Sequence, residues 1–100
     1  MPNPDRQLSG TFISESLADE IVETNLLSAI NVKKAVIDSR EIMQGDLFVA
    51  MRGTKHNGHA FVEEAIKRGA AAILIDEESS KPQQHSFILV RDSLTALQRL

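Results

Sequence analysis

Residues 37–61 read IDSREIMQGDLFVAMRGTKHNGHAF and contain the most strand-like run of the chain, residues 47–51. This run has apolar residues on both faces, which predicts a strand buried inside a layered sheet. Before it, Gly45 fits the third position of a type II turn, where a positive φ suits glycine. After it comes a polar, glycine-containing loop, residues 52–59. The stretch therefore predicts a buried strand that presents polar loops.

The neighbouring segments alternate between strand and helix patterns. Residues 60–68 form the best helix pattern, with Gly69 placed to end it and the i,i+4 pair Glu64–Arg68 on its surface. Strands are predicted at 32–37, 70–75 and 87–90, and a helix capped by Asp92 or Ser93 follows. This order predicts an α/β fold: a small three-layer domain with a mixed, partly parallel sheet and helices packed on it.

The first 30 residues are less regular. Residues 1–10 carry two prolines and read as a disordered leader, which leaves residues 11–100 as the domain. Ile13, Leu17, Ile21 and Val22 recur at helical spacing and predict one helix across them. Asn25 is a plausible end for this helix.

Composition limits the classes of function. The 100 residues have a net charge of −3, four Phe and no Trp or Tyr, so neither a basic nucleic-acid surface nor a base-stacking platform is expected. The absence of cysteine excludes disulfides and thiolate metal sites and suits a cytoplasmic protein. No apolar run approaches the ~20 residues of a transmembrane helix, so no membrane contact is expected.

The sequence offers one possible metal site and one possible catalytic triad, each with a structural alternative. His56 and His59 lie three residues apart, with Asp46 and His85 as conceivable further metal ligands, but loop histidines more often have structural roles. Asp38, Ser39 and His59 could form a nucleophilic triad on paper, yet no glycine elbow surrounds Ser39. The structural alternative has Asp38 making an Asx turn and Ser39 bonding to backbone. We therefore predict no catalytic residue and no metal ligand.

One ligand-binding arrangement remains open beside the alternative of ordinary solvated loops. The loops 38–40 and 53–58 each follow an apolar strand. If those strands are adjacent and parallel, both loops lie at the sheet edge where α/β folds bind ligands. Backbone N–H groups, the hydroxyls of Ser39 and Thr54 and the cations Arg40 and Lys55 would suit an anionic ligand such as a nucleotide diphosphate. The phosphate-binding motif G-x-x-x-x-G-K-[ST] is absent from the chain.

A spaced pattern through this region resembles the N-terminal domain of the Mur ligases. It comprises Asp38-Ser39-Arg40, residues 45–50 (GDLFVA), Gly53, residues 57–61 (NGHAF), Ala65 and residues 69–72 (GAAA). The resemblance covers residues 32–100 and is looser before them. The family usually has Pro where Gln44 stands and Asp where Asn57 stands, and asparagine keeps an Asx-type turn.

The resemblance implies a role in bacterial cell-wall synthesis. Mur ligases use ATP to add amino acids to a UDP-N-acetylmuramoyl peptide, and their N-terminal domain holds the uridine diphosphate end. ATP and Mg²⁺ would belong to the absent central domain, so this chain alone would hold no cofactor and would not be an enzyme. Its partners would be the UDP-N-acetylmuramoyl peptide and the missing central and C-terminal domains, in the bacterial cytoplasm.

Carried over residue by residue, the resemblance implies contacts with the uridine diphosphate from eight residues: Ile37, Ser39, Arg40, Thr54, Lys55, His56, Asn57 and Gly58. Residues 90–97 look slightly more like the ligase that adds D-alanyl-D-alanine to the tripeptide. The alternative is the ligase that adds diaminopimelate or lysine. Two readings of other classes stay open: a free-standing nucleotide-binding regulatory module and a purely structural domain.

Overall fold

A five-stranded mixed sheet forms the centre of the computed structural model, which describes residues 8–27, 30–53 and 56–100. The strand order is β2-β7-β6-β5-β4. Four neighbouring strands run parallel, and β2 joins β7 antiparallel at one edge. The bounds of these strands are Ile21–Thr24 for β2, Ala35–Val36 for β4, Leu47–Val49 for β5, Ala72–Ile75 for β6 and Phe87–Val90 for β7. The predicted mixed, partly parallel sheet is confirmed.

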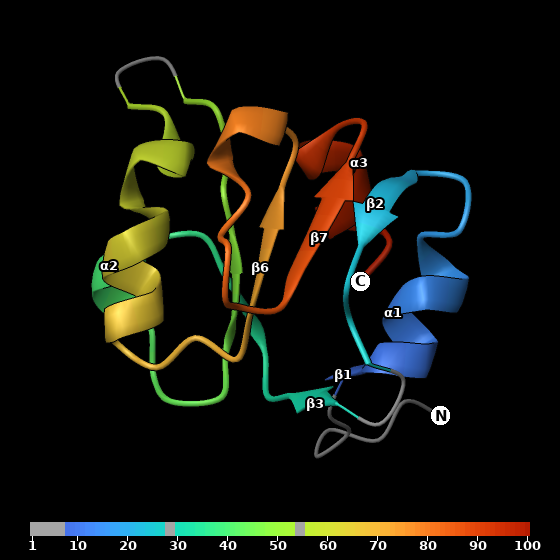
Figure 1. The fold of residues 1–100 in the computed structure, drawn as a ribbon, viewed down its shortest axis with the longest axis horizontal. Coiled ribbons are helices and arrows are strands. Elements are labelled where there is room, and N and C mark those ends of the chain that lie inside the picture. The colour runs from blue at the N-terminus through green and yellow to red at the C-terminus, as the bar shows by residue number, and fades with distance from the viewer. Residues whose placement is uncertain (1–7, 28–29, 54–55) are drawn as a thin grey trace.

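Helices cover both faces of this sheet, so the predicted three layers are confirmed (Figure 1). On one face α1 (Gly10–Ser16) and α3 (Ser93–Gln98) pack over the side chains of Leu47 and Val49. On the other face α2 (Val62–Lys67) packs over Phe48. The alternation of β5 side chains between two apolar layers explains why its sequence is apolar on both faces. No helix in the described ranges is long and apolar enough to cross a bilayer.

Short elements complete the chain. The strands β1 (Leu8–Ser9) and β3 (Asn31–Val32) have two residues each and pair antiparallel as a separate small sheet. Single 3-10 turns form η1 (Ser39–Glu41), η2 (Gly58–Phe61) and η3 (Glu78–Ser80). The η2 turn runs directly into α2, so together they occupy the region predicted as one helix.

Two expectations for the N-terminal part are wrong. Ile21 and Val22 do not continue the first helix, because α1 ends at Ser16 and a turn leads into β2. Ile21 instead pairs with Val90 on the neighbouring strand β7. This tertiary pairing decides the local structure, although the apolar residues have helical spacing. The leader also ends earlier than residue 10, since Leu8 is buried in the core and pairs with Val32. Residues 1–7 lie outside the described residues.

Two glycines with positive φ meet at the edge of the sheet where β5 begins. Gly45 has φ +93°, and the Asp46 N–H donates to the Met43 carbonyl at 3.1 Å, which confirms the predicted turn. Gly69 has φ +104° and follows α2 as predicted. Its N–H donates to Ile66 and that of the next residue to Ala65, which is the Schellman pattern. The Gly45 N–H then donates to the Gly69 carbonyl at 2.9 Å, joining the two turns.

The register of β4 on β5 places the two predicted loops at one edge. Ala35 pairs with Leu47 and Val36 with Phe48, both in parallel. Because parallel strands end at the same edge, the segments that follow Val36 and Val49 lie side by side. This confirms the condition on which the ligand-binding prediction depended.

The Gly69→Ala variant is expected to lose about 1–3 kcal/mol of unfolding free energy. A left-handed conformation is costly for alanine, and the added Cβ would lie 3.0 Å from the Gln44 Cα. Urea denaturation measures the change. The matched control is Lys67→Ala, at an exposed position two residues earlier, which should change stability by less than about 0.5 kcal/mol. Equal losses in both variants would contradict the assigned role of Gly69.

Candidate functional site

A cavity of about 480 Å³ lies where β4 and β5 end. One wall comes from the segment after β4, and the other comes from residues 51–53, residues 56–58 and η2. Its lining residues are Ile37, Asp38, Arg40, Met51, Gly53, His56, Gly58 and Phe61. The cavity therefore joins the two loops that the sequence predicted to meet.

Apolar side chains form much of this lining. Ile37 and Phe61 are 56% and 37% exposed, and together with Met51 they give the cavity apolar surface that solvent can reach. The His56 ring stands edge-on to the Phe61 ring, with centroids 6.4 Å apart and planes at 76°. Exposed apolar walls beside polar groups are typical of a site for a flat organic group.

The polar rim on the β4 side is held by Asp38. Its carboxylate accepts from the Arg40 N–H at 2.9 Å, capping η1, and from the Arg40 guanidinium at 3.0 and 2.8 Å. These bonds from Arg40 lower the pKa of Asp38 to about 2. The predicted Asx turn is thus confirmed, and it fixes the exposed Arg40 guanidinium at the mouth of the cavity.

Ser39 faces away from the cavity. Its hydroxyl is buried and donates to the Glu64 carboxylate at 2.9 Å. The expectation that Ser39 bonds to backbone is therefore wrong. Because Glu64 belongs to α2 and also pairs with Arg68 at 3.4 Å, this bond ties η1 to the helix beside it. The Glu64–Arg68 ion pair confirms the predicted i,i+4 pair.

The other wall is formed by two paired arms, residues 51–53 and 56–58, which are called the hairpin below. The Gly58 N–H donates to the Met51 carbonyl at 2.7 Å, and the Gly53 N–H donates to the His56 carbonyl at 2.8 Å. A Cβ on Gly58 would lie 2.7 Å from the Met51 nitrogen, so only glycine allows the two arms to approach this closely. The hairpin is thus closed by its own backbone.

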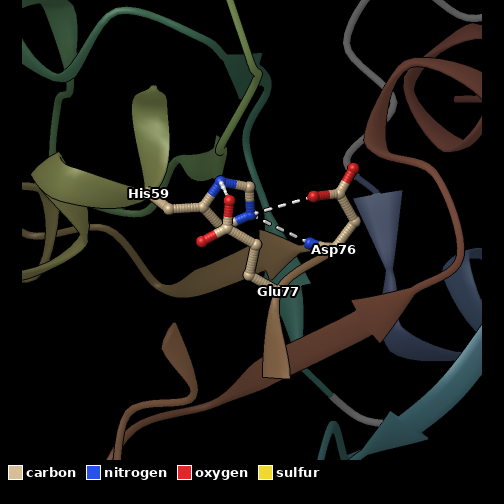
Figure 2. Close-up of side chains that lie close together, drawn as sticks. All are labelled: His59, Asp76 and Glu77. Carbon is tan, nitrogen blue, oxygen red and sulfur yellow. Dashed lines mark hydrogen bonds and ion pairs between the residues drawn. The ribbon is translucent and has the colours of Figure 1, made fainter. Parts of the chain in front are cut away.

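Behind the hairpin His59 links η2 to the end of β6. The Asp76 N–H donates to His59 Nε2 at 3.0 Å, so Nε2 carries a lone pair and Nδ1 carries the proton. Nδ1–H donates to Asn57 Oδ1 at 2.7 Å, and the same oxygen caps η2 by accepting from the His59 N–H. Figure 2 shows His59 between Asp76 and Glu77, with the ring contacting both residues. The asparagine keeps the Asx-type turn that the sequence predicted.

Burial lowers the pKa of His59 below its usual value, against the opposing influence of the Glu77 and Asp76 carboxylates. The ring is therefore held neutral, in agreement with the lone pair on Nε2.

The structure does not assemble the two alternative sites considered from sequence. Ser39 bonds to Glu64, while His59 bonds to Asn57 and Asp76, so the triad partners are engaged elsewhere. Asp46 pairs with Lys34 at 2.9 Å, and His85 Nε2 contacts the Ala70 carbonyl at 2.8 Å, so neither joins the loop histidines.

A different group has its ligand atoms within 4.8 Å of one another: His59, Asp76 and Glu77. Both ring nitrogens of His59 are already used in hydrogen bonds, which suits a structural network better than metal ligation.

Four of the eight predicted binding residues line the cavity: Ile37, Arg40, His56 and Gly58. Ser39 and Asn57 are not in the lining: Ser39 bonds to Glu64 on α2, and Asn57 caps η2. Thr54 and Lys55 lie outside the described residues. Sequence reasoning missed Met51 and Phe61 as cavity walls, because their apolar character was assigned to the core. It also missed Asp76 and Glu77, although a polar pair directly after a buried strand was a visible signal.

A second, larger cavity of about 670 Å³ lies between α2 and the loop that leads to β7. Its lining includes Val62, Ile66 and Glu63 from α2 and Lys81 from the loop. The Lys81 ammonium is engaged by Glu23 at 2.8 Å, and Glu78 lies 3.6 Å from it. None of the eight predicted binding residues lines this cavity.

Comparison with known proteins connects the chain to one family. A family model described as "Mur ligase family, catalytic domain" matches residues 31–100. The UDP-N-acetylmuramoyl-tripeptide--D-alanyl-D-alanine ligase of Bacillus subtilis (strain 168) is 45% identical over 64 residues, which cover 63% of this chain and 14% of that protein. The UDP-N-acetylmuramoyl-L-alanyl-D-glutamate--2,6-diaminopimelate ligase of Parabacteroides distasonis is 43% identical over 95 residues, covering 92% of this chain and 18% of that protein. The chain thus spans less than a fifth of either relative.

Solved structures agree on the fold. A crystal structure of MurF from Acinetobacter baumannii superposes with a TM-score of 0.79 at 18% identity, covering 97% of this chain and 21% of that one. MurF from Thermotoga maritima, solved in complex with ADP, gives a TM-score of 0.57 at 34% identity over 62% of this chain and 14% of that one.

The lowered pKa of His59 predicts that stability falls as the pH drops below the ordinary histidine pKa of 6.5. In this window the unfolded chain takes up a proton on His59 near its ordinary pKa of 6.5, whereas the folded chain does so only at lower pH. The stabilising contribution is therefore present above pH 6.5 and is lost as the pH falls through the folded pKa. Urea unfolding at several pH values measures the slope, which should become shallower in His59→Gln. An unchanged slope in that variant would contradict the assignment.

Proposed function

Because the chain belongs to the Mur ligase family, we propose that it anchors the uridine diphosphate end of a UDP-N-acetylmuramoyl peptide. The single observation that carries the proposal is the cavity formed where β4 and β5 end. Its lining combines apolar side chains with a charged one, on segments that follow two adjacent parallel strands, which is where α/β folds bind ligands.

The lining offers different chemistry for the two parts of such a ligand. Ile37, Met51 and Phe61 provide apolar surface that suits a flat uracil ring. Arg40 at the rim provides a fixed cation, and Gly53 and Gly58 allow a phosphate to approach the backbone closely. A base between apolar walls and a diphosphate at a polar rim together account for the mixed lining.

The mechanism in this proposal is positioning. Holding the uridine end fixes the distant peptide carboxylate for chemistry elsewhere in the parent protein, which lowers the entropic part of the barrier. We place the folded part of the chain, from Leu8 onward, in the N-terminal domain of a longer bacterial, cytoplasmic ligase. ATP and Mg²⁺ would be used by its central domain, since the chain itself lacks the G-x-x-x-x-G-K-[ST] motif.

A titration with UMP tests the anchoring role. Amide NMR shifts are expected at residues 37–40 and 56–58 with UMP and not with AMP, because the cavity walls would select the smaller base. The Phe61→Ala variant should weaken UMP binding roughly five- to hundredfold, the range for losing one base–aromatic stack. The control is Val22→Ala, which changes an exposed apolar residue on β2, the outermost strand on the side of the sheet away from β4. This variant should bind UMP as the unmodified chain does.

Two results would count against the proposal. One is an equal response to UMP and AMP, which would favour a general nucleotide-binding module. The other is a folded Phe61→Ala variant that binds UMP as tightly as the unmodified chain, which would move the base to another surface.

Within the family we propose the ligase that adds D-alanyl-D-alanine. The Bacillus subtilis relative of this type has the higher identity, and the Thermotoga maritima structure at 34% identity is also a MurF. The Parabacteroides distasonis relative of the other type covers more of the chain, so the two ligases must be compared directly.

The parent protein is expected to release phosphate from ATP when it is given UDP-N-acetylmuramoyl-tripeptide and D-alanyl-D-alanine. With the corresponding dipeptide substrate and diaminopimelate or lysine, we expect turnover at least tenfold lower, because the binding pockets discriminate by substrate length and charge. A phosphate-release assay measures both rates. The reverse order of rates would assign the protein to the other ligase type and leave the anchoring role intact.

A further inference from the structure

We infer that Asp76 and Glu77 are positioning residues that hold the hairpin arms, residues 51–53 and 56–58, against the sheet and so set the shape of the nucleotide cavity. The inference rests on the proposed function for its link to ligand binding. Both residues lie outside the cavity lining and outside the motifs that carried the family resemblance.

The hairpin has two different faces. Met51 and Gly53 on one arm, and His56 and Gly58 on the other, line the cavity. The residues between them, Arg52 and Asn57, pair with each other across the hairpin. Because side chains alternate along an extended chain, these two point away from the cavity. Whatever holds Arg52 and Asn57 therefore orients the hairpin without touching the ligand.

Glu77 holds both of these residues. Its Oε2 accepts from Asn57 Nδ2 at 2.7 Å and lies 3.3 Å from Arg52 Nε. The same oxygen lies 3.5 Å from His59 Nδ1. One carboxylate oxygen thus contacts both arms of the hairpin and the turn that follows it.

Asp76 fixes the same group to the rigid part of the fold. Its Oδ1 lies 3.3 Å from Arg52 Nε, its backbone N–H donates to His59 Nε2 at 3.0 Å, and its Oδ2 accepts from the Ser93 N–H at 3.0 Å where α3 begins. The side chain is only 8% exposed, so these interactions are poorly screened by solvent. Asp76 directly follows β6, a fully buried strand next to β5. Asp76 and Glu77 therefore fix the hairpin to the end of a buried strand of the sheet.

The test compares two neighbouring carboxylates in the 100-residue chain. Glu77→Gln and Asp76→Asn should each weaken UMP binding about tenfold, because each removes a charged hydrogen-bond partner of the hairpin. Glu78→Gln is the matched control: Glu78 is the next residue, is 77% exposed and contacts only Lys81 in the described chain, at 3.6 Å. It should leave the UMP dissociation constant within twofold.

A second control separates positioning from simple loss of stability. Asp46 is also a buried, ion-paired carboxylate, but it supports the turn at the start of β5, the edge opposite the cavity. Asp46→Asn should lower the urea midpoint without changing the UMP dissociation constant. If Asp46→Asn weakens UMP binding as much as Glu77→Gln does, the effect is one of general stability and the inference is overturned.

A ligand-free readout keeps this inference distinct from the proposed function. In Glu77→Gln, the amide resonances of Gly53, His56 and Gly58 should move, although all three residues are remote in sequence from position 77. If they move while the unmodified chain fails to bind UMP, the hairpin support stands and the proposed function fails. If they stay in place, or if both variants bind UMP within twofold of the unmodified chain, the inference is overturned.

Discussion

The parallel pairing of β4 with β5 is the constraint on which the site depends. Only two residue pairs make up this register, Ala35 with Leu47 and Val36 with Phe48. A parallel pair brings the ends of both strands to one side, and so it sets the segment from Ile37 onward beside the hairpin arms, residues 51–53 and 56–58. The short β4 strand is reinforced from outside the sheet, where Ser39 bonds to Glu64 on α2. A small amount of backbone pairing therefore determines where a much larger cavity forms.

Side chains that accept hydrogen bonds from backbone N–H groups fix the turns and helices that follow the parallel strands. Asp38 caps η1, Asn57 caps η2 and Asp92 caps α3, each by accepting from a backbone N–H two or three residues later. All three elements begin at the edge where the parallel strands end. Each cap satisfies a donor that the short helix or turn cannot pair internally. The loops at this edge consequently have defined conformations without long regular elements to support them.

Local sequence signals predicted the central part of the fold well. The positive φ of Gly45 and Gly69 and the strand at β7 follow from turn chemistry and apolar runs that neighbouring residues alone determine. The start of the chain was predicted less well because tertiary pairing decides it: Ile21 enters a strand only because β7 offers an unpaired edge. At the site, the motif residues can be identified from sequence. Asp76 and Glu77 contact partners 17 or more residues away, and the polar pair after β6 does not by itself indicate which residues those partners are.

The joined turns at Gly45 and Gly69 lie at the edge of the sheet opposite the cavity. Their hydrogen bond joins the turn before β5 to the turn between α2 and β6, while the cavity rim is made of exposed side chains such as Ile37 and Arg40. The rim side chains Ile37 and Arg40 are therefore not needed for these turns, whereas Gly58 both lines the cavity and closes the hairpin. During evolution, rim side chains could be exchanged to suit a different ligand without disturbing the architecture, so related proteins can diverge in specificity faster than in shape.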